Sequence, residues 1–158
     1  MATKWIVYAM SIIQLGIISC SEDLKPTPYV YTKVFTGENS KTWKIKFFEQ
    51  TLNGEINDTF SVNCSSDDLY TFYANSERTL QIKTGSKKCS STEASVITDS
   101  WSFNNGSATL IMILPVLADF SLPMIVKEAG KNKMVLEIFL DAANTESYRI
   151  HFESTNEN

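Results

Sequence analysis

Histidine and cysteine, which serve most often as metal ligands and catalytic groups, are scarce in this chain. Among 158 residues there are three cysteines and one histidine, His151. A structural zinc site needs four ligands at clustered spacings, so we expect no metal site. No Gly-x-Ser-x-Gly segment is present to expose a serine nucleophile. We therefore expect a protein that is not an enzyme, with no catalytic residues and no cofactor.

Positive charge is also sparse. The chain has 14 basic and 18 acidic residues, a formal net charge of −4. Because no basic run is interleaved with aromatic residues, we expect no nucleic-acid partner. The excess acidity is spread along the chain, which favours solubility more than any specific binding.

An uncharged apolar run begins the chain. It covers residues 5–18, follows Lys4 and ends at Ile17-Ile18-Ser19-Cys20. This run is shorter than the roughly 20 residues of a membrane-spanning helix, and it is typical of a signal peptide. Its end resembles a bacterial lipobox, which predicts a signal peptide over 1–19 and a lipid on Cys20. The alternative is an ordinary secretory signal with a coincidental cysteine.

The other two cysteines are Cys64 and Cys89. Lipidation of Cys20 explains the odd cysteine in an exported chain and leaves these two as a natural pair. In an oxidising compartment we expect them to form a disulfide. The closed loop would constrain the unfolded chain by about 3.5 kcal/mol.

Residues 20–40 are predicted to be a lipid-anchored tether. Ser21-Glu22-Asp23 follow the anchor, and Pro26 and Pro28 favour extended chain. In some bacteria, acidic residues just after the lipidated cysteine mark export to the outer surface; the alternative is a simple solvated linker. We expect attachment to the outer membrane, on its periplasmic or its surface-exposed face.

The remaining residues, 41–154, are predicted to be one β domain. Trp43, Ile45 and Phe47 alternate with Lys44 and Lys46, which indicates a half-buried strand. Further strand-like segments are 55–62, 69–73, 80–83, 101–103, 108–114, 124–127, 134–140 and 148–152. No helix pattern follows residue 20. These segments predict an all-β fold, an antiparallel up-and-down meander of about eight strands closed as a barrel, or alternatively a β-sandwich.

Several of these segments together resemble a known family. Trp43, Cys64-x-x-Asp-Asp-x-Tyr-x-Phe, Lys88-Cys89 and Trp101-x-Phe-Asn-Asn-Gly are similar to the lipocalin-like lipoproteins of Bacteroidetes. The resemblance covers about residues 40–153 and implies a small antiparallel barrel on a lipid anchor outside the cytoplasm. Two segments depart from the family pattern. Ala74-Asn75-Ser76-Glu77 replaces an Asp-Gly-like turn, and the segment 115–123 is longer and more apolar.

The segment 115–123 is predicted to be a loop with apolar side chains that something must cover. It could close the barrel mouth as a lid, cover the outward Ile111 and Ile113, or dock a partner. The methionines of the neighbouring strands could line an adaptable pocket or simply fill the core. The residues we expect to bind a ligand are Phe120, Leu122, Met112, Met124 and Met134.

Other polar and aromatic candidates are interpreted as structural. Asp67-Asp68 is expected to serve a turn, with contact to calcium or a polar ligand as the alternative. His151 is expected to face outward, and Trp43, Trp101 and Phe103 to form the barrel floor rather than a cofactor site.

Two functions fit this pattern. The first is a binding protein whose barrel interior holds a small apolar or amphipathic ligand. The second is a non-enzymatic interaction protein with a packed barrel that contacts a protein or glycan partner in the envelope.

Overall fold

The computed structural model describes residues 29–155. The predicted signal peptide, Cys20 and the first part of the predicted tether lie outside these residues. The described chain is all-β with one short α-helix, which confirms the predicted fold class. Among the described residues, no helix has the length and apolar character needed to cross a bilayer.

The chain forms a single antiparallel sheet of ten strands. The helical elements are α2 (Tyr29–Thr36) and the 3₁₀ turn η2 (Asn63–Ser65). The strands are β1 (Ser40–Leu52), β2 (Glu55–Phe60), β3 (Leu69–Tyr73), β4 (Thr79–Lys83), β5 (Val96–Ser100), β6 (Ser102–Asn104), β7 (Thr109–Leu114), β8 (Ala118–Ala129), β9 (Lys133–Phe139) and β10 (Glu146–Ser154).

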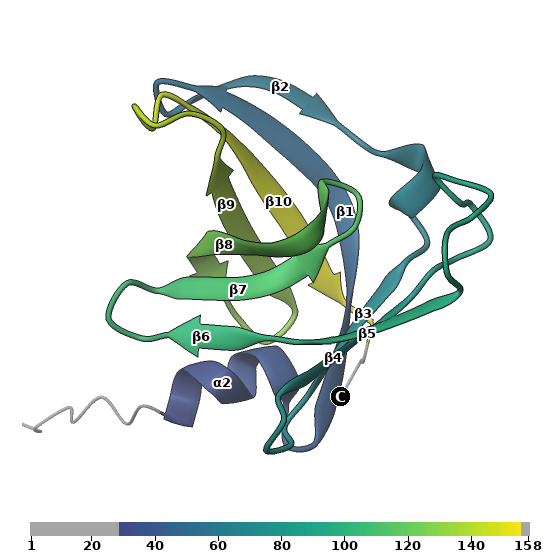
Figure 1. Ribbon diagram of the computed structural model, residues 1–158. Helices are drawn as coiled ribbons and strands as arrows, with labels where there is room; N and C mark the ends of the chain where they lie inside the picture. The colour runs from purple at the N-terminus through teal and green to yellow at the C-terminus, as the bar shows by residue number, and fades with distance from the viewer. Residues whose placement is uncertain (1–28, 156–158) are drawn as a thin grey trace, which may run out of the picture.

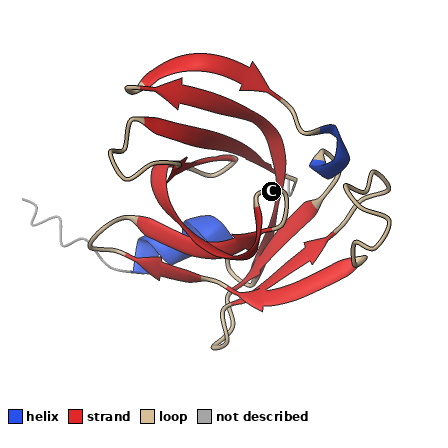
Figure 2. Cartoon of the chain, turned by 45° about the horizontal axis from the view of Figure 1, so that its top comes forward, coloured by secondary structure: helices blue, strands red, loops and turns tan. Residues whose placement is uncertain are grey.

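The hydrogen-bonded order of the strands shows that the sheet is a nearly closed barrel. The order is β5-β4-β3-β1-β10-β9-β8-β7-β6, and β2 pairs with β1 off this path. The two end strands, β5 and β6, are separated in the chain by Trp101 alone. They act as one kinked strand whose first part pairs with β4 and whose second part pairs with β7. Figure 2 shows the strands curving around a common interior.

Strand β1 carries a register shift that changes which of its residues enter the core. The pairing with β10 is irregular between Ile45 and Phe47. As a result Trp43, Ile45 and Phe48 are buried in the core. Phe47, which the alternation placed on the same face as Trp43, stacks instead on His151, with 4.2 Å between ring centroids. A bulge inserts one extra residue and so reverses the faces beyond it.

The first hairpin follows the expected turn chemistry. Asn53 and Gly54 both have positive φ, at 52° and 85°, as a type I′ turn requires. Strand β2 pairs with β1 with a register shift between Gln50 and Thr51. The pairing of this polar strand with β1 is therefore irregular.

The expectation of no helix after residue 20 is wrong. Residues Tyr29–Thr36, inside the predicted tether, form α2, which Figure 1 shows below the barrel. Phe35 of this helix is fully buried and belongs to the core. The segment is rich in β-branched and aromatic residues, which are poor helix formers, so packing of Phe35 outweighs local propensity.

The expectation of a loop over 115–123 is also wrong. The turn is confined to residues 115–117, and β8 begins at Ala118. Pro123 lies within β8 opposite Ile111 of β7, whereas pairing of β8 with β9 begins only at Ile125. Pro123 therefore sits where β8 has one hydrogen-bonded neighbour, the kind of position at which a strand tolerates proline.

The predicted disulfide between Cys64 and Cys89 is present. It joins η2 to the polar loop that precedes β5. Strand β5 was missed because it follows directly on that polar loop and its side chains are exposed or half-buried.

Large side chains occupy the barrel interior. The fully buried set includes Trp43, Tyr70, Phe35, Phe48, Phe72, Phe152, Leu80, Ile82, Leu110, Met112, Leu114 and Met124. Phe35 packs against Phe72, Trp101 and Phe103 at centroid distances of 6.4, 6.1 and 5.1 Å. These contacts place α2 against one end of the barrel core.

Candidate functional site

The residues predicted to bind a ligand do not gather around one opening. Met112, Met124 and Met134 are fully buried members of the core cluster, and Leu122 packs against that cluster. Phe120 is separate from them, with 63% of its surface exposed on β8. The structure therefore places the three methionines in the core, which agrees with the interpretation that they fill it, packs Leu122 against them and leaves Phe120 outside.

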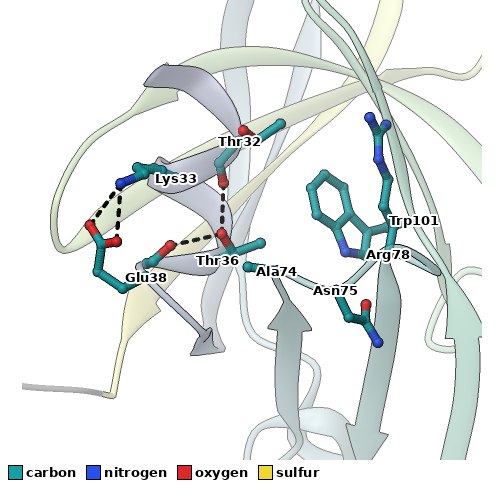
Figure 3. Close-up of a pocket in the computed structure, with 9 residues that line it drawn as sticks. Thr32, Lys33, Thr36, Glu38, Ala74, Asn75, Arg78 and Trp101 are labelled. Carbon is teal, nitrogen blue, oxygen red and sulfur yellow. Dashed lines mark hydrogen bonds and ion pairs between the residues drawn. The ribbon is translucent and has the colours of Figure 1, made fainter. Parts of the chain in front are cut away.

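A pocket lies elsewhere, at the end of the barrel that α2 covers. It encloses about 250 Å³. Its lining comes from α2 and the turn after it, from the β3–β4 turn, and from the residue between β5 and β6: Thr32, Lys33, Thr36, Gly37, Glu38, Ala74, Asn75, Arg78 and Trp101. Figure 3 shows the indole of Trp101 facing α2 across this space.

The helical wall of the pocket is fixed by its C-terminal turn. Gly37 has φ of 61°, and its N–H donates to the carbonyl of Lys33 at 2.8 Å. This is the left-handed position that glycine favours after a helix. On the other side of α2, the Lys41 ammonium donates to the carbonyl of Val34 at 3.2 Å. The first contact ends the helix, and the second ties it to the start of β1.

The opposite wall is the turn between β3 and β4. The N–H of Ala74 donates to the carbonyl of Asn39 at 2.8 Å, which ties the turn to the segment before β1. The Asn75 side chain bridges the turn, because its amide donates to the Thr79 hydroxyl at 2.8 Å and its carbonyl accepts from the Thr79 N–H at 2.9 Å. The Asn75 side chain is thus committed to holding the turn.

Trp101 and Arg78 form the inner wall. The backbone N–H of Trp101 donates to the carbonyl of Arg78 at 2.9 Å. The Arg78 guanidinium carbon lies 5.6 Å from the centroid of the Trp101 ring, within range of a cation–π contact. Figure 3 shows the Arg78 side chain running beside the indole. Trp101 itself is only 3% exposed.

The polar side chains of the pocket differ in whether they already form hydrogen bonds or ion pairs within the protein. Lys33 donates to both carboxylate oxygens of Glu38, at 2.9 and 3.0 Å. The Thr36 hydroxyl donates to the carbonyl of Thr32 at 3.1 Å. In contrast, no hydrogen bond or ion pair to the Arg78 guanidinium comes from any residue between 29 and 155. Arg78 is therefore the unengaged cation of this site.

The two core tryptophans, Trp43 and Trp101, differ in whether the indole N–H has a hydrogen-bond acceptor. The Trp43 Nε1–H donates to the carbonyl of Phe35 at 2.9 Å. The Trp101 Nε1 is buried without a hydrogen-bond partner among the described residues. Buried indole N–H groups usually find an acceptor, so Trp101 is the exception that needs an explanation.

Sequence reasoning placed Trp101 in the barrel floor but did not find the pocket. It did not predict α2, which forms one wall of the pocket. The sequence did carry a helix signal, because Pro28 stands just before and Gly37 just after this eight-residue stretch. That arrangement of proline before and glycine after is typical of a helix. The departure at residues 74–77 from the expected turn was a second signal, because this turn leads into Arg78.

A buried carboxylate on the outer face of the barrel is a second notable cluster. Glu137 is 3% exposed and accepts from Arg149 Nε at 3.0 Å and Ser147 Oγ at 2.9 Å. Its second oxygen lies 3.1 Å from Lys127 Nζ. Burial raises the pKa of the Glu137 carboxyl, but these partners together outweigh burial and hold the pKa below its usual value. The Glu137 carboxylate is bonded by all three of these side chains, which is typical of a structural network.

His151 lies beside this cluster on the outer face, as predicted. Its Nε2 is 2.9 Å from Glu49 Oε2, and its ring stacks on Phe47. These two atoms are close, but their geometry is not that of a hydrogen bond. No nucleophile contacts His151 in these interactions.

Asp67 and Asp68 serve the turn, which confirms their structural interpretation. Asp67 Oδ2 accepts from the N–H and hydroxyl of Ser86, at 2.8 and 2.9 Å. Asp68 Oδ1 accepts from the N–H of Gly85 at 2.8 Å. A Cβ at Gly85 would lie 2.0 Å from the Asp67 side chain, so only glycine fits there. Between residues 29 and 155, no cluster of three or more metal-ligating side chains is found.

Comparison with known proteins adds no relative. No family model matches the chain, and no curated protein is similar to it. The pocket geometry is therefore the basis for the functional proposal.

Proposed function

We propose that the protein is a lipid-anchored binding protein outside the cytoplasm, and that it holds a small amphipathic ligand in the pocket between α2 and the β3–β4 turn. The observation that carries this proposal is the unengaged guanidinium of Arg78 beside the indole of Trp101 in a pocket of about 250 Å³. Ligand sites combine apolar walls with a few placed polar groups. The inner wall of this pocket offers an apolar surface in the Trp101 indole and a polar group in the Arg78 guanidinium.

The pocket is a better site than the barrel interior that the sequence favoured. The interior is filled with large side chains, including Trp43, Tyr70 and Phe152. A ligand there would have to displace close-packed core atoms, whereas the pocket is already open between two secondary-structure elements. The proposal therefore keeps the binding function and moves the ligand to the helix-covered end.

The cysteines support the proposed compartment and lipid anchor. The Cys64–Cys89 disulfide favours an oxidising compartment. The lipobox-like Ile17-Ile18-Ser19 before Cys20 supports a lipid anchor. We place the protein at the outer membrane on these grounds. Binding without turnover fits the scarcity of nucleophile–base pairs.

The second candidate function is contact with a protein or glycan partner in the envelope. The observation that favours it is the hairpin of β1 and β2, where Leu52 and Ile56 are 45% and 55% exposed. Strand β2 pairs only with β1 among the described strands, so its other edge is open to a partner strand.

The proposed function is tested by native mass spectrometry of the protein purified from its own host. We expect a small molecule to co-purify with the wild type. Ala74→Trp should exclude it, because Ala74 is an exposed wall residue and a bulky side chain there fills the pocket. The control is Ser76→Trp, two residues along the same turn and not part of the lining, which should retain the ligand.

The opposite result would be equally clear. If the wild type carries no small molecule, or if Ala74→Trp and Ser76→Trp carry it equally, the pocket is not the ligand site. A co-purifying protein or glycan lost on replacing Ile56 would then support the interaction function.

A further inference from the structure

We propose that the ligand of this pocket is a small organic carboxylate and that Arg78 binds its carboxyl group. This inference rests on the proposed function and specifies its ligand class. It follows from the backbone at Arg78, from the environment of its guanidinium, and from the charge of the pocket lining.

The backbone at position 78 does not call for arginine. Arg78 has φ of 49°, in the left-handed region. Its N–H donates to the carbonyl of Asn75 at 3.1 Å, which closes the β3–β4 turn. Such a position favours glycine, because a side chain is strained there. An arginine held at a strained turn position points to a role for its side chain.

The guanidinium of Arg78 is exposed to solvent, where a ligand can reach it. It has five N–H donors, and no described residue accepts from them. Contact with the Trp101 ring restricts where the side chain lies. Restricting a donor group before binding lowers the entropy lost when the ligand arrives.

The pocket lining carries one uncompensated positive charge. Its ionisable side chains are Lys33, Glu38 and Arg78, that is, two cations and one carboxylate. Lys33 and Glu38 form an ion pair with each other. Glu77, next to Arg78 in the chain, is not part of the lining, and its carboxylate accepts from Ser76 Oγ at 2.6 Å. The single remaining charge suits a monoanion.

A carboxylate fits this site better than a phosphate. A guanidinium binds a carboxylate through two parallel hydrogen bonds, and the single charges match. The rest of the pocket offers the Trp101 ring and the Ala74 side chain as apolar contacts. A volume of about 250 Å³ limits the ligand to a small molecule, below the usual range for drug-sized ligands.

The test compares benzoate with benzamide, which has the same shape without the charge. The full chain is titrated with each, following the indole N–H resonance of Trp101, which Trp101→Phe identifies. We expect benzoate to bind at least tenfold more tightly than benzamide. Arg78→Gly should abolish this preference while keeping or raising the thermal midpoint, because glycine suits the left-handed backbone. Arg78→Lys should retain part of the preference.

Lys83→Gln is the control for loss of charge. Lys83 is exposed at the end of β4 away from the β3–β4 turn. This variant should bind benzoate like the wild type, so a loss seen only in Arg78→Gly cannot come from net charge.

The outcomes separate this inference from the proposed function. Equal binding of benzoate and benzamide would overturn the carboxylate and leave the pocket as a ligand site. Retention of the preference in Arg78→Gly, or binding of inorganic phosphate as tight as benzoate, would also overturn it. Failure of benzoate to bind at tens of millimolar overturns the inference, whereas co-purification of a neutral molecule would still support the proposed function.

Discussion

At the scale of single residues, the two core tryptophans allow a matched comparison. The Trp43 Nε1–H donates to the buried carbonyl of Phe35, whereas the Trp101 Nε1 has no partner among the described residues. Both rings are buried in the same core cluster. Replacement by phenylalanine removes a similar ring volume from each.

We predict that Trp43→Phe destabilises the protein more than Trp101→Phe, by about 1–3 kcal/mol. The reason is that only the first substitution leaves a buried carbonyl without its donor. Urea unfolding of both variants at equal m-value provides the measurement. Equal losses would mean that the Trp43 hydrogen bond contributes little.

The second residue-scale prediction concerns Glu137 and pH. Its partners hold the pKa of the carboxyl in the folded protein below its usual value, against the effect of burial. A carboxyl of this kind stabilises the fold above its unfolded pKa of about 4.3, and the stabilisation is lost as pH falls through the lower folded pKa. Glu137→Gln should therefore cost stability at pH 7, and the difference from wild type should shrink below about pH 4.

The control for this prediction is Glu153→Gln. Glu153 pairs with Lys46 at 2.7 Å, but both side chains are half exposed. A surface pair contributes about 0–1 kcal/mol. Chemical unfolding at several pH values should show little change for this variant, and an equal pH effect in both would contradict a special role for Glu137.

At the scale of elements, α2 is the part of the fold that local propensity does not explain. Its Phe35 lies fully buried against Phe72, Trp101 and Phe103. The helix therefore depends on the barrel end, and the barrel end depends on the helix for cover.

We predict that Phe35→Ala lowers the free energy of unfolding by about 3–5 kcal/mol, as loss of a buried phenylalanine does. Lys33→Ala, on the exposed side of the same helix, should change it by about 0.5 kcal/mol or less. Thermal and urea unfolding measure both. A small effect of Phe35→Ala would mean that α2 is dispensable for the fold.

The disulfide is the second feature that links separate elements of the fold. It joins η2 to the loop before β5, where hydrogen bonds from Ser86 to Asp67 already hold the same loop. We predict that replacing Cys64 and Cys89 together with alanine lowers stability by about 3.5 kcal/mol, from the length of the closed loop. Mass spectrometry of the untreated protein should show no free thiol at either position. Two free thiols would refute the bond.

At the scale of the whole molecule, the barrel has a packed interior and a pocket at one end. Its core consists of buried apolar side chains, and its pocket lies where α2 meets the barrel. Under the proposed function, this arrangement would separate stability, which resides in the packed interior, from ligand binding at the helix-covered end.

Anchoring belongs to this scale as well. Cys20 lies outside the described residues, and its lipidation stays a prediction from the lipobox-like segment. Cys20→Ser should release the protein from the membrane fraction into the soluble fraction, detected by immunoblotting after ultracentrifugation. Retention of Cys20→Ser in the membrane fraction would contradict the anchor.

The sequence by itself determined the fold class, because alternation with period two does not depend on distant contacts. The pattern of Met134, Leu136 and Ile138 places one face of β9 inside, and the structure agrees. Asn53-Gly54 specified its turn for an equally local reason, since both residues tolerate positive φ. The pairing of Cys64 with Cys89 was predicted because the lipobox-like segment assigns the third cysteine, Cys20, to a lipid.

Only the tertiary structure decided where the pocket lies. Burial of Phe35 makes a helix of a β-prone segment, a bulge in β1 turns Phe47 outward, and partial pairing of β8 admits Pro123. Arg78 and Trp101 are distant in sequence from Thr36, and they meet it because the barrel brings the β3–β4 turn and the β5–β6 junction to the end that α2 covers. Each of these outcomes depends on contacts between distant segments, which a local sequence pattern does not encode.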